Sequence, residues 1–199
     1  MKIFGLTGKT GAGKTTVSEL LSSMGFYVIN GDRIARNVTA PGKPALKELA
    51  AAFGFDIVDE NGVLDRALLA SRAFADKNST ALLNSITHPY IRKDFEAEIE
   101  KAALKGYEKV VIDAAALLES NCKDLCSSII VVSAPKDIRL KRILSRDGIS
   151  EKQAETRMKA QFPDEYYEKK ADIIIKNYPP FDKDIKAQLY ILTENTDEN

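Results

Sequence analysis

The sequence predicts an α/β fold of three layers, in which a five-stranded parallel sheet is flanked by helices. Short apolar runs rich in β-branched residues alternate with helix-like or loop-like segments, a pattern that favours a parallel sheet. The length of 199 residues suits one such domain with a segment or two to spare for lids. The expected strands are residues 3–6, 27–29, 110–112, 129–132 and 173–175.

The first expected strand runs directly into a glycine-rich segment. Residues 8–15 match GxxxxGK[ST], and residues 16–24 continue as an amphipathic stretch. Such a loop needs glycine because its backbone must curl until several N–H groups point at phosphate oxygens. The four specified positions coincide by chance in a chain of this length only about 1% of the time. The segment therefore predicts a phosphate-binding loop, or P-loop, ahead of a helix N-terminus that also favours anions.

The chemistry of this loop assigns roles to its residues. Lys14 should bridge the β- and γ-phosphates of ATP, and the hydroxyl of Thr15 should ligate Mg²⁺. Mg²⁺ is therefore the expected cofactor, with ATP as co-substrate. The predicted ATP-binding residues of the loop are Gly8, Gly11, Ala12, Gly13, Lys14, Thr15 and Thr16.

Asp32 follows the second expected strand, at the edge where ligands of open parallel sheets collect. A carboxylate there could face the γ-phosphate and accept the proton of an acceptor hydroxyl, or orient the attacking oxygen. A second interpretation is that Asp32 only caps the helix that begins near Arg33. No NKxD-type base-reading segment follows a later strand, which favours a kinase over a switch GTPase.

Two helical regions interrupt the expected sheet. No strand is expected between residues 32 and 105, where helical periodicity covers residues 44–53, 65–74, 79–86 and 90–104. A charged helical stretch lies between the fourth and fifth strands, where a lid over a nucleotide could sit. The expected P-loop kinase fold is a single domain, residues 1–199, made of a nucleotide-binding core (1–31, 106–135 and 171–192), a helical substrate-binding insertion (32–105) and a helical lid (136–170).

Three arginines of the expected lid, Arg139, Arg142 and Arg146, are spaced three and four apart, so one helix face would present all of them. Planar guanidinium groups are suited to clamping a migrating phosphoryl group. An arginine-rich helix is otherwise more often a solvated surface. Its place after the fourth strand favours catalytic roles for Arg142 and Arg146, beside Lys14 and Asp32.

Composition narrows the choice of partners. The 29 basic and 29 acidic residues cancel, so no global charge favours nucleic acid or an anionic membrane. The sequence has no apolar run of about 18 residues and no signal-peptide pattern, so we expect a cytoplasmic protein. Cys122 and Cys126, with the single histidine His88, do not form a metal-ligand pattern, and we expect reduced cysteines. The expected partners are small molecules, with no nucleic acid and no membrane, for a monomer or weak homo-oligomer.

Several segments match one family pattern in order along the chain. Residues 5–16, GLTGKTGAGKTT, are similar to GLTGGIGSGKST, and residues 30–36, NGDRIAR, are similar to DADxIAR. Further similar positions are Pro41 with Gly42, Phe53 with Gly54, residues 61–66, His88 with Pro89, residues 115–119, Arg157 with Gln161 in an RxxxQ pattern, Ala171 with Asp172, and Asn177. From Gly5 to about Asn177 the chain thus resembles the dephospho-coenzyme A kinase family.

This resemblance implies an ATP-dependent phosphotransferase with an alcohol acceptor. The γ-phosphoryl group of Mg·ATP would move to the ribose 3′-hydroxyl of dephospho-coenzyme A, the last step of coenzyme A biosynthesis. Asp32 would be the catalytic carboxylate, and Asn177 would lie near the adenine and bind ATP. The substrate-binding residues that the resemblance implies are Asp32, Arg36, His88, Leu117 and Glu119.

The chain also departs from the family pattern. Lys9 and Thr10 replace a glycine and an apolar residue in the loop, Asn30 and Gly31 replace an aspartate and an alanine, and Ala115 replaces a proline. Phosphoryl transfer survives these changes, whereas the acceptor could differ. The alternatives are another nucleoside- or nucleotide-type small-molecule kinase and a non-catalytic ATP-binding module. Asp32 and the lid arginines argue against the second, because binding alone requires neither.

Overall fold

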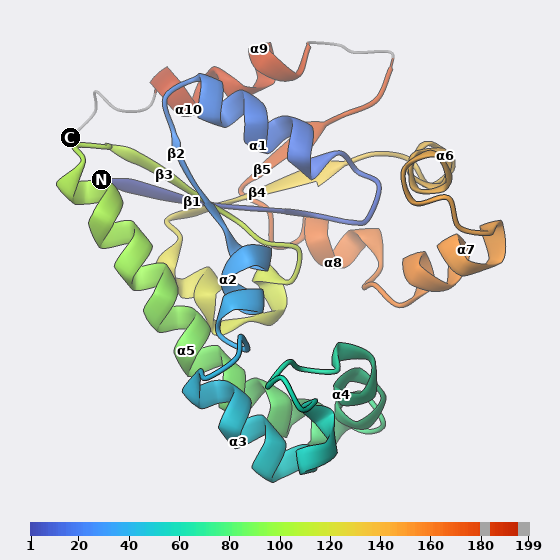
Figure 1. Ribbon diagram of the computed structural model, residues 1–199. Helices are drawn as coiled ribbons and strands as arrows, with labels where there is room; N and C mark the ends of the chain where they lie inside the picture. The colour runs from blue at the N-terminus through green and yellow to red at the C-terminus, as the bar shows by residue number, and fades with distance from the viewer. Residues whose placement is uncertain (180–183, 195–199) are drawn as a thin grey trace. The chain divides into compact units, whose positions relative to one another are not determined.

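Five strands form one parallel sheet in the computed structural model, which describes residues 1–179 and 184–194 (Figure 1). The strands are β1 (Lys2–Gly8), β2 (Tyr27–Asn30), β3 (Lys109–Asp113), β4 (Ser128–Ser133) and β5 (Ile173–Lys176), in the spatial order β2-β3-β1-β4-β5. Each predicted strand is confirmed, with ends moved by one or two residues.

The centre of the sheet is β1, which pairs with β3 on one side and with β4 on the other. In these parallel pairs Leu6 lies opposite Asp113, and Gly8 lies opposite Val132. The carboxyl ends of parallel strands meet at one edge. The segment that follows Gly8 therefore starts beside the ends of β3 and β4.

Helices cover both faces of the sheet, which confirms the three predicted layers (Figure 1). On one face, α1 (Lys14–Ser23), α9 (Ile185–Leu189) and α10 (Ile191–Glu194) bury Val17, Leu21, Leu189 and Leu192 against the strands. On the other face lie α8 (Asp164–Glu168) and the 3₁₀ helices η2 (Leu117–Glu119) and η3 (Asn121–Leu125). Tyr167 of α8 packs there with Leu118 and Val131.

Two helices between β4 and β5 pack against each other. They are α6 (Lys136–Asp147) and α7 (Glu151–Lys159), and Figure 1 shows them together beyond one end of the sheet. Ile143, Ala154 and Met158 are buried between them. Ser150 and Gln153 form a capping box at the start of α7, which satisfies helix-end N–H groups. The predicted helical character of residues 136–170 is confirmed.

Residues 30–101 form one compact unit, the helical unit, and residues 1–29 and 102–199 form the other. The helical unit contains α2 (Gly31–Asn37), α3 (Pro44–Phe53), η1 (Phe55–Ile57), α4 (Arg66–Ala73) and most of α5 (Lys77–Leu104). Its own core includes Leu46, Leu49, Ile57 and Leu69. Of the expected core segment 171–192, residues 180–183 lie outside the described residues, as do residues 195–199 of the chain.

Both segments expected to be helical on either side of Pro89 are helical, but they belong to one helix. The expected helices at residues 79–86 and 90–104 are a single helix of 28 residues, α5, which passes through Pro89. Proline lacks the N–H for one helical hydrogen bond, and its ring disturbs the preceding turn. Burial on both sides of Pro89 offsets this cost, because Thr87 and Phe95 are each less than one-tenth exposed. Tertiary packing therefore keeps the helix continuous.

Candidate active site

The phosphate loop of residues 8–15 joins the end of β1 to the start of α1. Gly11 and Gly13 adopt φ values of +80° and +92°, which side chains resist. A Cβ at Gly11 would lie 2.5 Å from the carbonyl oxygen of Arg139. A Cβ at Gly13 would clash with Nδ2 of Asn177. Glycine is therefore required at both positions by dihedral angle and by close packing.

Two side chains hold the loop by its carbonyl groups. Nη1 of Arg142 donates to the carbonyl oxygens of Gly11 and Ala12 at 3.3 and 3.1 Å. Nδ2 of the buried Asn177 donates to the Ala12 carbonyl at 2.9 Å, and the Asn177 carbonyl accepts from Nη2 of Arg142 at 2.8 Å. Arg142 and Asn177 thus brace the loop and each other. The structure places Asn177 against the loop backbone, where sequence reasoning had only associated it with adenine.

Lys14 forms an ion pair with Asp113, which lies at the carboxyl end of β3 and is 8% exposed. Sequence reasoning missed Asp113 as a site residue. The signal was present, because an acid that ends an apolar run, here Val-Val-Ile-Asp, is typical of the strand acid that assists Mg²⁺ in P-loop enzymes. Lys14, Thr15 and Asp113 therefore lie around the start of α1 at the edge of the sheet.

The lid arginines differ in surroundings. Arg139 is buried at 3% exposure, and Arg142 contacts the loop. Arg146 is exposed and pairs instead with Asp147, at 2.7 Å from Nε to Oδ1. Arg157 also pairs with Asp147, at 2.8 Å from Nη1 to Oδ2. The hydrogen bonds from Arg146 are the largest cause that lowers the pKa of the Asp147 carboxyl, and the positive charges of Arg146 and Arg157 lower it further. In this structure Arg146 is therefore engaged by Asp147 rather than by the loop, and its catalytic role stays a prediction.

The segment after β3 supplies one core residue and one titratable residue. Leu117 is fully buried, and its side chain fills the space beside Gly5, so it cannot meet a substrate in this conformation. Leu117 thus has a packing role in this structure, and its contact with a substrate stays a prediction. Burial raises the pKa of the Glu119 carboxyl, although Lys170 and a hydrogen bond from Tyr167 oppose this.

The remaining predicted site residues belong to the helical unit. Asp32 is exposed on the first turn of α2. The cap of that helix is Asn30, whose Oδ1 accepts from the Arg33 N–H at 2.8 Å, so Asp32 is not the cap. Arg36 lies in the last turn of the same helix with an exposed side chain. Burial lowers the pKa of the half-buried His88 in α5.

The helical unit also contains a cavity of about 210 Å³. Its walls are mainly apolar, with the side chains of Leu49, Leu69 and Ile91 among them. The hydroxyl groups of Thr39 and Thr87 and the guanidinium of Arg66 add polar atoms. A cavity of this kind suits a slender ligand that is largely apolar with a few polar groups.

Metal-binding groups of protein origin are few. Within residues 1–179 and 184–194, His, Cys, Asp and Glu form no cluster of three that could hold a metal ion alone. Mg²⁺ commonly takes only one or two protein ligands with phosphate oxygens and waters. The Thr15 hydroxyl and the Asp113 carboxylate fit that requirement. Both cysteines are free thiols, and burial raises the pKa of Cys126 to about 12.

A search of the described helices finds none with the length and apolarity to cross a membrane.

Comparison with known proteins agrees with this geometry. The family model described as dephospho-CoA kinase matches residues 2–181. A dephospho-CoA kinase from Corynebacterium glutamicum is 41% identical over 93% of this chain and 94% of its own length. A crystal structure from Thermus thermophilus matches with a TM-score of 0.80, 28% identity and 98% coverage of each chain. A dephospho-CoA kinase from Campylobacter jejuni matches with a TM-score of 0.58 and 26% identity, over 96% of this chain and 95% of that one. The chain therefore belongs to the dephospho-CoA kinase family.

Proposed function

We propose that this kinase transfers the γ-phosphoryl group of ATP to the ribose 3′-hydroxyl of dephospho-coenzyme A at the loop of residues 8–15. The observation that supports this most is the loop itself, with Lys14, Arg142 and Asp113 gathered on it at the carboxyl edge of the sheet. Phosphoryl transfer demands mainly positioning and neutralisation of charge. Two cationic side chains and a curled backbone supply both.

Lys14 acts on the phosphates. In the structure its ammonium contacts Asp113, and we propose that it turns to the β- and γ-phosphate oxygens when ATP enters. That movement frees a carboxylate oxygen of Asp113. Arg142 remains on the loop carbonyls and presents its positive charge beside the phosphates. A catalytic role for Arg146 stays a prediction that needs its release from Asp147.

Thr15 and Asp113 would hold Mg²⁺, the hydroxyl as a direct ligand and the carboxylate directly or through water. When bound, Mg²⁺ neutralises charge on the phosphate oxygens. Asp113 is a buried residue, 8% exposed, so the packing around it restricts the position of its carboxylate. Loss of Asp113 should therefore weaken Mg·ATP binding more than loss of an exposed acid.

Asp32 is the proposed general base. Its carboxylate would accept the proton of the ribose hydroxyl as the hydroxyl oxygen forms a bond to the γ-phosphorus and the bond to the departing ADP breaks. Asp32 follows the end of β2 by two residues, on the first turn of α2. Because Asn30 caps α2, the carboxylate of Asp32 is not required for capping.

The cavity of the helical unit is the proposed place for the acceptor's pantetheine arm. The arm is a slender chain with methylene segments, amides and a terminal thiol. The cavity offers about 210 Å³ between apolar walls, with the Thr39 and Thr87 hydroxyls and Arg66 at its margin. Burial of methylene groups would favour binding, and the polar groups would orient the amides. Arg36 and His88 of the same unit are further candidates for acceptor contacts.

The remaining expectations stay predictions. They are a cytoplasmic location, a monomer or weak homo-oligomer, and no nucleic-acid or membrane partner. Cell fractionation and sedimentation of the purified chain check the first two.

An acceptor panel tests the proposed function. Purified protein with Mg·ATP should form ADP in proportion to added dephospho-coenzyme A, and far less with adenosine, thymidine or shikimate. The product should carry its new phosphate on the ribose 3′-oxygen by phosphorus NMR. Equal turnover of nucleosides, or none of the coenzyme precursor, would overturn the acceptor assignment.

A further inference from the structure

The phosphate loop has contacts outside the bracing pair of Arg142 and Asn177. The N–H of Thr10 donates to Oε1 of Gln161 at 2.8 Å. The ammonium of Lys9 lies 2.9 Å from Oδ1 of Asp164. Gln161 follows the end of α7 and Asp164 begins α8, so residues 161–164 form a joint between these helices. Two adjacent loop residues are thus tied to one joint.

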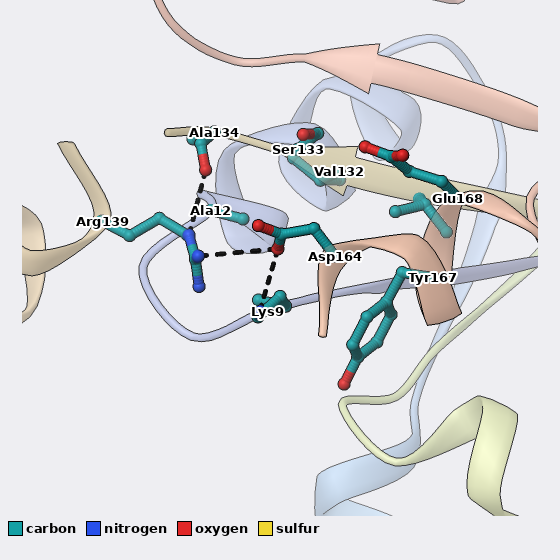
Figure 2. Close-up of a pocket in the computed structure, with 10 residues that line it drawn as sticks. Lys9, Ala12, Val132, Ser133, Ala134, Arg139, Asp164, Tyr167 and Glu168 are labelled. Carbon is teal, nitrogen blue, oxygen red and sulfur yellow. Dashed lines mark hydrogen bonds and ion pairs between the residues drawn. The ribbon is translucent and has the colours of Figure 1, made fainter. Parts of the chain in front are cut away.

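Asp164 is shared by two cations, as Figure 2 shows. Its Oδ1 atom also lies 3.6 Å from Nη2 of Arg139. Arg139 is 3% exposed, and its Nε donates to the Ala134 carbonyl at 3.0 Å. Its Nη1 is buried without a hydrogen-bond partner among the described residues. Removal of the Asp164 carboxylate would therefore leave Lys9 and a buried guanidinium facing each other uncompensated.

The joint completes a set of contacts along the loop. Residues 11–13 are held by Arg142, Asn177 and the Arg139 backbone, and residues 9 and 10 are held by the joint. Every residue from 9 to 13 therefore touches a group from the segment 139–177. A loop held in this way does not have to be ordered by its ligand, so less entropy is lost when ATP binds.

We propose that Gln161 and Asp164 are positioning residues for ATP, which hold loop residues 9 and 10 in the shape that accepts the triphosphate and tie that shape to the lid helices. The proposal rests on the proposed ATP site. It also assigns Lys9, a departure from the family pattern, to a contact with α8 rather than to the triphosphate. Gln161 and Asp164 act through the loop and touch no reacting atom.

The first experiment separates the hydrogen bond from general stability. Gln161→Met keeps the side-chain length but removes the acceptor, and Gln161→Glu keeps an acceptor. In the methionine variant we expect KM for ATP to rise about three- to ten-fold, the net worth of one hydrogen bond, with kcat within about two-fold. Exchange of the Thr10 amide proton, measured by NMR, should accelerate with Met and stay slow with Glu.

Gln153→Met is the matched control. It breaks the capping box at the other end of α7, so it should lower thermal stability while KM for ATP and Thr10 exchange stay unchanged. Equal effects of Gln161→Met and Gln153→Met on KM and on Thr10 exchange would overturn the proposal, since Gln161 would then act only as a structural residue of α7.

The second experiment uses the shared carboxylate. Asp164→Asn should raise KM for ATP more than Lys9→Met, because Lys9→Met leaves the Arg139 pair intact. The double variant should recover part of the loss, because the repulsion between Lys9 and Arg139 is gone. Strictly additive effects would contradict the shared role of Asp164.

Affinity for a non-hydrolysable ATP analogue, measured by calorimetry without acceptor, makes both tests independent of the acceptor assignment. If the wild-type protein binds the analogue but does not phosphorylate dephospho-coenzyme A, the proposed acceptor fails and the positioning proposal is still tested. If Gln161→Met and Asp164→Asn bind the analogue as the wild type does, the positioning proposal fails alone.

Discussion

The contacts that hold the phosphate loop join residues far apart in sequence, whereas the helix caps inside the helical unit join near neighbours. Lys14 and Asp113 are 99 residues apart in sequence, and Ala12 and Asn177 are 165 residues apart. In the helical unit, the side chains of Asn30 and Asp65 cap helices through N–H groups three residues ahead.

This difference decides which parts of the fold each region needs for its shape. A cap or turn formed by neighbouring residues needs only its own helix. The loop takes its shape only after β1, β3, α6 and β5 have come together. Changes around the loop should therefore act on ATP and on chemistry, whereas changes inside the helical unit, apart from the proposed general base Asp32, should act on the acceptor.

The largest expected effect is that of Asp32→Asn. Removal of a general base typically lowers the rate about 10²- to 10⁴-fold. We expect this fall in kcat with little change in ATP affinity, measured by pre-steady-state ADP release and by analogue titration. Glu60→Gln, which removes an exposed acid of the same unit, should leave the rate near wild type. An unchanged rate for Asp32→Asn would make Asp32 a structural residue.

Lys14→Ala should lower kcat/KM for ATP about 10²- to 10³-fold, because a preorganised positive charge at the phosphates is lost. Steady-state kinetics with varied ATP measures this. Lys123→Ala, at an exposed position in η3, serves as the control for loss of one lysine. A fall below ten-fold would show that Arg142 and Mg²⁺ suffice without Lys14.

A pair of glycines tests whether packing against α6 matters. Gly11 and Gly25 both have positive φ, at +80° and +87°, but a Cβ at Gly25 meets nothing within 4 Å. Gly11→Ala should lower kcat/KM about 10²-fold, since an added methyl displaces the loop from the Arg139 backbone. Gly25→Ala shares the dihedral strain and should change only thermal stability. Similar kcat/KM values for the two variants would contradict the proposal that close packing of Gly11 against the Arg139 backbone matters for activity.

The cavity of the helical unit is tested by filling it. Ala70→Phe, at the wall of the cavity, should raise KM for dephospho-coenzyme A about ten-fold or more. The reason is that a hydrophobic pocket loses about ten-fold or more in affinity for each apolar group of the substrate that it can no longer accommodate. KM for ATP should not change. Slow phosphorylation of adenosine 5′-monophosphate, which has the ribose but no arm, should also be unaffected. An equal loss with both acceptors would place the arm elsewhere.

The smallest expected effect concerns pH. Burial lowers the pKa of His88, so the folded state binds fewer protons than the unfolded state just below the ordinary histidine pKa. The free energy of unfolding therefore decreases as pH falls below about 6.5, where the histidine of the unfolded state gains its proton. His88→Gln should flatten the free energy of unfolding between pH 7.5 and 5.5, measured with urea. An identical slope in both proteins would contradict burial of the imidazole.

Local pattern was sufficient for much of the fold. Each strand and the helices at residues 44–53 and 65–74 could be predicted because alternation, helical period and caps act between near neighbours. The continuity of α5 through Pro89 could not be predicted, since the local helix-breaking tendency of proline yields to packing of Thr87 and Phe95. The site was predicted less completely. Asp113 carried a readable signal, and the RxxxQ pattern singled out Gln161, but nothing in the sequence linked Gln161 or Asp164 to residues 9 and 10 of the loop.

The motif at residues 8–15 implied phosphate binding without any structure, because glycines, a lysine and a hydroxyl at that spacing serve little else after a strand. Chain order and period likewise implied a parallel sheet with two helical additions. Only the folded arrangement could show that Arg142 and Asn177 hold the loop and that Lys9 reaches α8. The physical reason is distance along the chain, since a side chain's partner more than a hundred residues away is chosen by how the layers pack and not by its neighbours in sequence.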